Sequence, residues 1–208
     1  TVKMTVQLDW QKSMRFTVNV RIPGWARNEV VPGGLCKFCD ALNEPVTLTV
    51  AGQDMPVKLD KGYVSLDRSW KSGDVIELDM PMLIRRVVAS EKVAADRGRV
   101  ALQRGPVVFC VEWPDVPDGK VRKLLLPDEQ PVTTRFAPAL LDGVQVIEGK
   151  GFNVATNQFG KAFKRLQDFT AIPYFAWGNR GPGEMAVWIP KTESALCEPE
   201  PAKSKSGN

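Results

Sequence analysis

Hydrophobic and polar residues alternate with a period of two over residues 16–22. Apolar side chains occupy the even positions, and Thr, Asn and Arg occupy the odd positions between them. Because successive side chains of a β-strand point to opposite faces, this pattern predicts a strand with one buried face. Pro23 and Gly24 follow directly and indicate that a turn ends the strand.

Similar short runs recur along the chain, separated by turns that contain Gly, Pro or Asp. Strands spaced in this way are typical of an antiparallel β-sandwich or jelly roll, so we predict an all-β fold. Residues 178–183 are expected to form the loop of the last hairpin, which joins residues 171–177 to 184–190. The expected strands cover residues 46–50, 55–59, 63–66, 75–80, 83–89, 99–103, 107–111, 124–126, 132–136 and 144–147, followed by a hairpin of 171–177 and 184–190.

Three segments lack this alternation. Residues 28–45 contain prolines and paired glycines, which predict a long loop with one short helical turn. Residues 149–160 are rich in Gly and Asn and are also expected to form a loop. The run 159–167 is interpreted as a short helix.

The length of 208 residues accommodates two small domains. We predict two packed β subdomains, residues 1–100 and 101–190, and a flexible C-terminal tail over 191–208, where apolar residues become scarce. The chain starts at Thr1 inside a β-like run, which is expected of a fragment of a longer protein. No basic leader followed by an apolar segment is present, and no run approaches the ~20 apolar residues of a membrane span.

The chain contains no histidine, which excludes several kinds of site. A Ser-His-Asp or Cys-His nucleophile system, a zinc site with histidine ligands and a histidine pH switch all require that residue. Its 28 basic and 24 acidic side chains give a net charge of +4 that is spread along the sequence. Since nucleic-acid binding needs a concentrated basic face, neither nucleic acid nor a membrane is expected as a partner.

The chain contains four cysteines, which could act as metal ligands or as redox groups. Cys36 and Cys39 form a CxxC motif, but no second ligand pair and no redox-type α/β context accompany them. They remain weak candidates for a metal or redox role, or for a disulfide in an oxidising compartment. Cys110 lies in an apolar run and is predicted to be a buried small hydrophobic residue, while Cys197 lies in the polar tail.

Acidic and aromatic residues offer the remaining chemistry. Most carboxylates fall in turns, where Asp bonds to the neighbouring backbone, so no catalytic pair and no catalytic residue is predicted. Tyr174, Trp177, Asn179 and Arg180 combine aromatic and polar side chains in one loop and could bind a sugar. The alternative is that these aromatic rings pack at a domain edge, since Trp is usually buried. Arg104 is a second candidate, either for a buried ion pair or for an inter-domain contact.

Five ordered segments together resemble one known family. The resemblance is to the C-terminal β region of glycoside hydrolase family 127, the β-L-arabinofuranosidase group, and it covers most of residues 1–190. The segments are residues 16–27 (FTVNVRIPGWAR), 62–74 (GYVSLDRSWKSGD), 85–88 (RRVV), 96–109 (DRGRVALQRGPVVF) and 171–185 (AIPYFAWGNRGPGEM).

The resemblance implies a larger enzyme with an N-terminal (α/α)6 barrel whose cysteine nucleophile is bound to zinc. None of the barrel's motifs is present here, and the Cys36–Cys39 pair does not match its adjacent cysteines, so no catalytic or metal residue is transferred to this chain and no cofactor is expected in it. The implied role is non-catalytic support of that barrel, and the alternative is a carbohydrate-binding module. Implied partners are the barrel, a second copy in a homodimer and, through the parent enzyme, plant-type arabinose-containing glycans. A periplasmic or extracellular location follows only if the parent carries a signal peptide.

Overall fold

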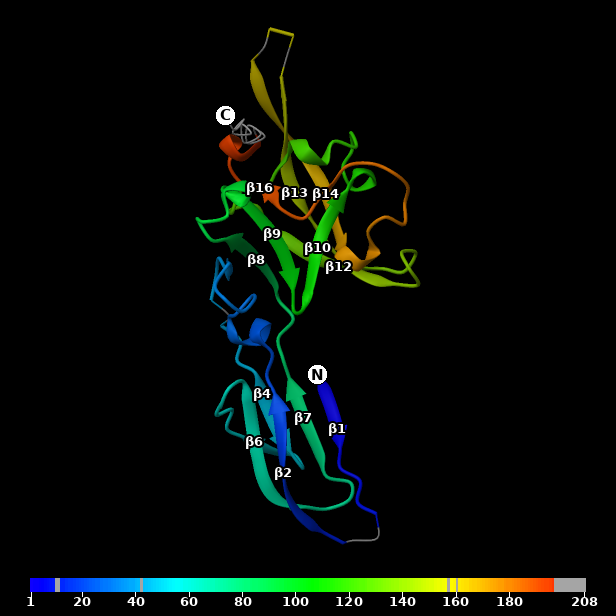
Figure 1. Ribbon diagram of the computed structural model, residues 1–208. Helices are drawn as coiled ribbons and strands as arrows, with labels where there is room; N and C mark the ends of the chain where they lie inside the picture. The colour runs from blue at the N-terminus through cyan, green and yellow to red at the C-terminus, as the bar shows by residue number, and fades with distance from the viewer. Residues whose placement is uncertain (10–11, 42, 157, 160, 197–208) are drawn as a thin grey trace, which may run out of the picture. The chain divides into compact units, whose positions relative to one another are not determined.

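The computed structural model describes residues 1–9, 12–41, 43–156, 158–159 and 161–196 (Figure 1). Its regular elements are β-strands and short 3-10 helices, and every strand pair is antiparallel. This confirms the predicted all-β, antiparallel fold class. Within the described ranges no helix has the length and apolar character needed to span a membrane.

The chain divides into two compact units. The first unit comprises residues 1–33 and 40–83, and its elements are β1 (Val2–Thr5), β2 (Met14–Arg21), η1 (Gly24–Arg27), β4 (Thr47–Val50), β5 (Gln53–Met55), β6 (Tyr63–Trp70) and β7 (Val75–Asp79). The second unit comprises residues 34–39 and those from 84 onward, and its elements are β3 (Cys36–Phe38), β8 (Ile84–Ala89), η2 (Ala94–Asp96), β9 (Arg99–Arg104), β10 (Val107–Glu112), η3 (Trp113–Asp115), η4 (Val121–Lys123), β11 (Leu124–Leu125), β12 (Val132–Ala137), β13 (Val144–Thr156), β14 (Ala162–Pro173), η5 (Tyr174–Ala176), β15 (Met185–Ala186), β16 (Ile189–Pro190) and η6 (Glu193–Leu196).

The division between the units lies at Leu83 and Ile84 rather than at the predicted residues 100 and 101. The reason is strand pairing: β8 pairs with β9, with Ile84 opposite Arg104 and Val87 opposite Ala101. Residues 84–100 therefore belong to the second unit. The short strand β3 pairs with the other edge of β8, so part of the expected loop 28–45 is a strand of the second unit.

In the first unit, a four-stranded sheet and a two-stranded sheet share one hydrophobic core. The larger sheet has the order β1-β7-β4-β5, and the smaller one pairs β2 with β6. The alternation predicted for residues 16–22 is confirmed, since Val20 and Ile22 are buried while Thr17, Asn19 and Arg21 are exposed. The core joins side chains of both sheets, namely Val20, Val64, Leu66 and Trp70 from the pair and Leu48, Val50, Ile76 and Leu78 from the larger sheet.

The second unit is built on a sheet with the order β11-β13-β14-β10-β9-β8-β3. Strands β12, β15 and β16 are added beside β13, β10 and β9. Both faces of this sheet are buried, because odd-numbered residues of β10 such as Phe109 and Val111 join one core cluster, while Cys110 joins another with Val146 and Ile172. The sheet therefore forms the centre of the second unit.

A long hairpin of β13 and β14 replaces the loop predicted for 149–160 and the helix predicted for 159–167 (Figure 1). The glycines that indicated a loop are required inside the strand. A Cβ at Gly151 would lie 2.7 Å from Leu124 Cδ1 and 2.8 Å from the carbonyl oxygen of Leu125. A Cβ at Gly149 would lie 3.0 Å from Phe169. Glycine within a strand thus marks close packing here rather than a turn.

The predicted final hairpin is wrong in its pairing. Strand β14 ends at Pro173 and continues into η5, while β15 pairs with β10 and β16 pairs with β9. Alternation identifies which face of a strand is buried, but it does not identify the neighbouring strand.

The first part of the predicted tail is packed against the second unit. Lys191 donates its backbone N–H to the carbonyl of Gly98 at 2.7 Å, and Ala195 in η6 is buried. The remainder of that segment, residues 197–208, lies outside the described residues.

Candidate functional site

An exposed aromatic surface lies at the end of β14, formed by residues 174–177, which we call the aromatic turn. The rings of Tyr174 and Trp177 are stacked, with their centroids 5.8 Å apart and their planes inclined by 18°. Tyr174 is 46% exposed, Trp177 is 48% exposed, and Phe175 between them is 66% exposed. The 3-10 geometry produces this arrangement, since the backbone N–H of Trp177 donates to the carbonyl of Tyr174 at 3.1 Å. The turn presents a flat apolar surface to its surroundings.

Arg180 is bound by two carboxylates, and we call Glu112, Asp115 and Arg180 the Arg180 cluster. Its Nε donates to Glu112 Oε2 at 2.7 Å, while its Nη1 and Nη2 donate to Asp115 Oδ1 and Oδ2 at 2.8 and 2.6 Å. The side chains of Glu112 and Asp115 are only 3% and 5% exposed, so the cluster is largely removed from water. The hydrogen bonds that Arg180 donates to Asp115, and then the one it donates to Glu112, raise the pKa of Arg180 above its ordinary value.

The cluster holds the loop that follows the aromatic turn. Glu112 Oε1 accepts a hydrogen bond of 2.8 Å from the backbone N–H of Gly178. Asn179 Nδ2 donates to the carbonyl of Ala176 at 3.0 Å. Of the four residues that the sequence singled out in this loop, Tyr174 and Trp177 are exposed, whereas Asn179 and Arg180 make structural contacts within the unit.

Sequence reasoning did not identify Glu112 and Asp115 as partners of Arg180. The local signal was a capping box, in which Glu112 and Asp115 each accept a hydrogen bond from the other's backbone, with Pro114 in the first turn of η3. A Glu-x-x-Asp spacing around a proline is the pattern expected of such a helix start. The alternation in β10 places Glu112 on the same face as Cys110, which directs its carboxylate toward the loop 178–180.

Arg104 is not part of this cluster. It lies at the end of β9, opposite Val107 of β10 and Ile84 of β8. It forms no ion pair with any residue that the structure describes, so the predicted buried ion pair is not observed. Its alternative role as an inter-domain contact stays a prediction.

The three described cysteines lie in different environments. Cys36 is half-buried in β3, Cys39 is exposed just after it, and no disulfide joins them in the described structure. Burial, assisted by Asp96, raises the pKa of Cys36 above its ordinary value. Over the described ranges, no group of three or more His, Cys, Asp or Glu side chains could hold a metal ion. Cys197 lies outside the described residues.

Cys110 is buried, as predicted from its apolar run. Burial raises the pKa of its thiol to about 12, and the nearby charges of Glu112 and Asp115 act in the same direction. A reactive cysteine needs a lowered pKa, so this environment is that of an inert core residue.

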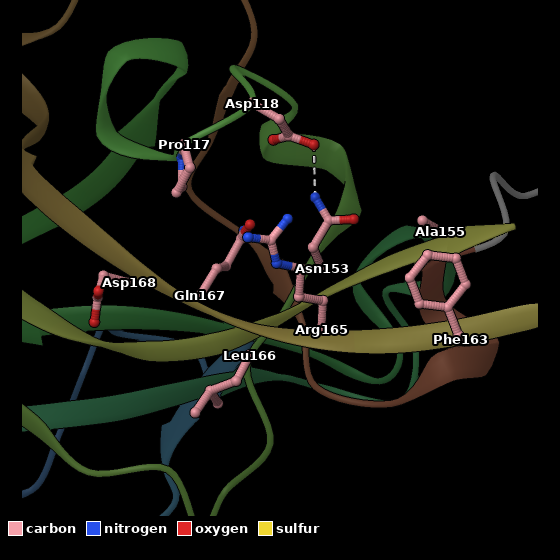
Figure 2. Close-up of a pocket in the computed structure, with 9 residues that line it drawn as sticks. All are labelled: Pro117, Asp118, Asn153, Ala155, Phe163, Arg165, Leu166, Gln167 and Asp168. Carbon is pink, nitrogen blue, oxygen red and sulfur yellow. Dashed lines mark hydrogen bonds between the residues drawn. The ribbon is translucent and has the colours of Figure 1, made fainter. Parts of the chain in front are cut away.

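A hollow of about 380 Å³ lies beside the β13–β14 hairpin, and we call it the β14 groove (Figure 2). Figure 2 shows the side chains of Asn153 and Arg165 on the side of the hairpin that faces Asp118, with Leu166 on the other side of β14. The pattern of residues does not indicate this site, because a loop is expected over 149–160 and a helix over 159–167 where the hairpin forms its wall. The groove is lined by Pro117, Asp118, Asn153, Ala155, Phe163, Arg165, Leu166, Gln167 and Asp168.

The register of the hairpin explains the chemistry of the groove. Asn153 lies opposite Arg165, Ala155 opposite Phe163 and Gly151 opposite Gln167, so one face of the hairpin carries a polar centre and an aromatic end. Asn153 Nδ2 donates to Asp118 Oδ2 at 2.6 Å, which ties the loop after η3 to this face. Amide, guanidinium and carboxylate groups therefore converge on one hollow.

The two units match two successive family domains. Residues 1–82 match the model of the family described as "Beta-L-arabinofuranosidase, GH127 middle domain". Residues 84–190 match "Glycoside hydrolase family 127 C-terminal domain". The boundary between the matches coincides with the structural division at Leu83 and Ile84.

Similar proteins are considerably longer than this chain. A "Non-reducing end beta-L-arabinofuranosidase" of Bifidobacterium longum subsp. longum is 27% identical over 215 residues, which cover 90% of this chain and 30% of that protein. A solved GH127 β-arabinofuranosidase has a TM-score of 0.86 and 38% identity, over 93% of this chain and 30% of its own. A GH127 β-L-arabinofuranosidase from Geobacillus stearothermophilus T6 has a TM-score of 0.76 and 34% identity, over 90% of this chain and 28% of its own.

Proposed function

The chain belongs to glycoside hydrolase family 127, and from this premise we propose that it forms the non-catalytic middle and C-terminal β domains of a β-L-arabinofuranosidase-like enzyme. The observation that carries the proposal is the match of its two units, in order, to the two β domains of that family. The chain spans 30% or less of the relatives compared above, which leaves room for a catalytic part elsewhere in the enzyme.

The residues of the chain support a structural role. In the second unit, Glu112, Asp115 and Arg180 form the Arg180 cluster. Their hydrogen-bonding groups are occupied by one another and by backbone groups. The described cysteines do not fit the zinc that the resemblance assigns to the catalytic barrel, since no set of three ligands surrounds them. Zinc, arabinose-containing glycans and the barrel itself are therefore proposed as ligands and partner of the whole enzyme. A homodimer is proposed for that enzyme as well.

The first experiment assays hydrolysis of an aryl β-L-arabinofuranoside by this 208-residue chain and by the full-length enzyme that contains it. We expect turnover by the full-length enzyme and release of the aryl group at the buffer rate by the chain alone, because among the described residues the paired carboxylates Glu112 and Asp115 are bound by Arg180 and the thiol of Cys110 is buried with a raised pKa. The released aryl group is followed by its absorbance. Turnover by the purified chain that scales with its concentration would contradict the proposal.

A second candidate function, binding of glycans, is favoured by the aromatic turn. The apolar C–H face of a sugar packs well on aromatic rings, and the Tyr174 and Trp177 rings are stacked and about half exposed. The Arg180 cluster holds the loop beside these rings, which lowers the entropy that binding would lose.

Titration of the chain with arabino-oligosaccharides tests this candidate through tryptophan fluorescence. We expect a saturable change in the millimolar range that is lost in Trp177→Ala and weakened about tenfold in Tyr174→Ala, because each change removes one stacking surface. The matched control is Phe136→Ala, which removes an aromatic side chain that is 54% exposed in the same unit. An unchanged affinity in Trp177→Ala would exclude the aromatic turn as the binding surface.

A further inference from the structure

The geometry points to the β14 groove as a binding site for one residue of a neutral saccharide. This inference deepens the proposed function and rests on it only for the choice of sugar. Three properties of the groove support it, namely an unpartnered polar group, a balance of charge and a combination of polar and aromatic walls.

The first property is an unused donor on Gln167. Its Nε2 is buried and has no hydrogen-bond partner among the residues that the structure describes. A buried amide without a partner costs about 1–3 kcal/mol in a folded protein, so native structures rarely retain one without a role. The side chain of Gln167 lines the groove, and rotation about its terminal C–C bond would turn the amide N–H groups toward a sugar hydroxyl, which would accept a hydrogen bond.

The second property is the charge distribution. Asp118 accepts hydrogen bonds from Asn153 Nδ2 and from the backbone N–H of Lys120, and it contributes one negative charge. Arg165 contributes one positive charge, and it forms no ion pair with the described residues. Asp168 at the other end is paired with Lys150 at 2.6 Å. One unpaired charge of each sign leaves the groove neutral in sum, which suits an uncharged polar ligand better than a phosphate or a uronate.

The third property is the arrangement of the walls. The guanidinium of Arg165 and the amide of Gln167 supply donors, and the second lone pairs of the Asp118 carboxylate can accept. Phe163, 47% exposed, lies at one end of the groove and offers a ring to an apolar C–H face. Hydroxyl groups donate and accept at once, so a furanose or pyranose ring fits donors, an acceptor and an aromatic surface together. The volume of about 380 Å³ is sufficient for one such ring and part of its neighbour.

The test follows the side-chain amide resonance of Gln167 by ¹⁵N NMR while the 208-residue chain is titrated with L-arabinose and an arabino-oligosaccharide. The resonance is assigned from its disappearance in Gln167→Leu. We expect a saturable shift of this resonance at about 10 mM sugar or below. Affinity should fall by about tenfold in Arg165→Ala, followed by the same resonance, and in Gln167→Leu, followed by the backbone amide resonances of β14, since each change removes a donor to the ligand.

Two controls separate binding from folding. Gln167→Leu should keep or raise the urea midpoint of the parent chain, because it removes a buried amide that has no partner among the described residues. Lys164→Ala, which changes the adjacent β14 residue on the opposite face, should keep the affinity.

The inference is overturned if sugar produces no saturable shift at Gln167, or if affinity is the same in the groove variants and the parent chain. It is also overturned if binding is lost only in Trp177→Ala, which would place the saccharide on the aromatic turn. Each of these results is compatible with inactivity of the isolated chain toward the aryl arabinofuranoside. The binding inference and the proposed function are therefore tested by different measurements, and one can be contradicted while the other stands.

Discussion

Replacing Arg180 by Met should lower the free energy of unfolding of the second unit by about 3–5 kcal/mol. The change removes the cation and leaves the carboxylates of Glu112 and Asp115, 3% and 5% exposed, beside each other without their shared donor. A buried charge without a partner costs far more than the ion pair itself contributes, because the desolvation of the carboxylates is no longer offset. Urea unfolding measures the loss, and hydrogen exchange of the β10 amides assigns it to the second unit.

Three further variants test whether the two stranded carboxylates cause the loss of stability in Arg180→Met. Arg135→Met removes an exposed ion pair with Glu148, formed at 2.7 Å in the same unit, and should change stability by about 0–1 kcal/mol. Arg180→Lys keeps the charge but loses the planar fork, so an intermediate loss is expected. Adding Glu112→Gln and Asp115→Asn to Arg180→Met should recover part of the stability, because the stranded charges disappear. A loss in Arg180→Met no larger than that of Arg135→Met would show that the cluster is not essential to the fold.

The fold was predictable where alternation was strong. Strand β2 follows directly from the period of two, while β9 and β10 follow from short, largely apolar runs that the turn Arg104–Val107 connects. The β13–β14 hairpin was not predictable, because its glycines resemble turn residues when read alone. They are explained only by the side chains that approach them, such as Leu124 beside Gly151 and Phe169 beside Gly149. The predicted helix over 159–167 failed for a related reason, since pairing with β13 outweighs local propensity.

The candidate site was predictable only in part. The loop 174–180 stood out because it concentrates aromatic and polar residues, and its aromatic rings are exposed as binding would require. The contacts of Arg180 were not predictable, because its partners Glu112 and Asp115 lie 68 and 65 residues before it in the sequence. The β14 groove had no sequence signal at all, because opposite residues of a hairpin such as Asn153 and Arg165 are neighbours only once the register is known.

Trp70→Ala should be the most damaging single change in the first unit, with an expected loss of about 3–5 kcal/mol in the free energy of unfolding. Trp70 is 0% exposed and ends the inward-facing series of β6. Its ring lies 5.8 Å from that of Phe16, and the guanidinium of Arg68 lies 5.2 Å above it. Its Nε1 donates to the carbonyl of Phe16 at 2.9 Å, so the side chain joins β2 to β6 by a hydrogen bond as well as by packing. Alanine would leave a cavity and remove the donor.

Trp70→Phe separates these two contributions, because it retains most of the apolar volume and removes only the indole N–H. We expect a loss of about 1–3 kcal/mol for this variant, near the cost of leaving a partly buried carbonyl without a donor. Trp177→Ala serves as the matched control, since it removes the same side chain type where it is 48% exposed, and it should change stability by less than about 1 kcal/mol. Hydrogen exchange should place the effect of Trp70→Ala on the amides of β2 and β6 while the β9 and β10 amides keep their protection, because the units have separate cores. If Trp70→Phe cost as much as Trp70→Ala, the hydrogen bond rather than the packing would dominate, and equal losses in Trp70→Ala and Trp177→Ala would remove Trp70 from the centre of this core.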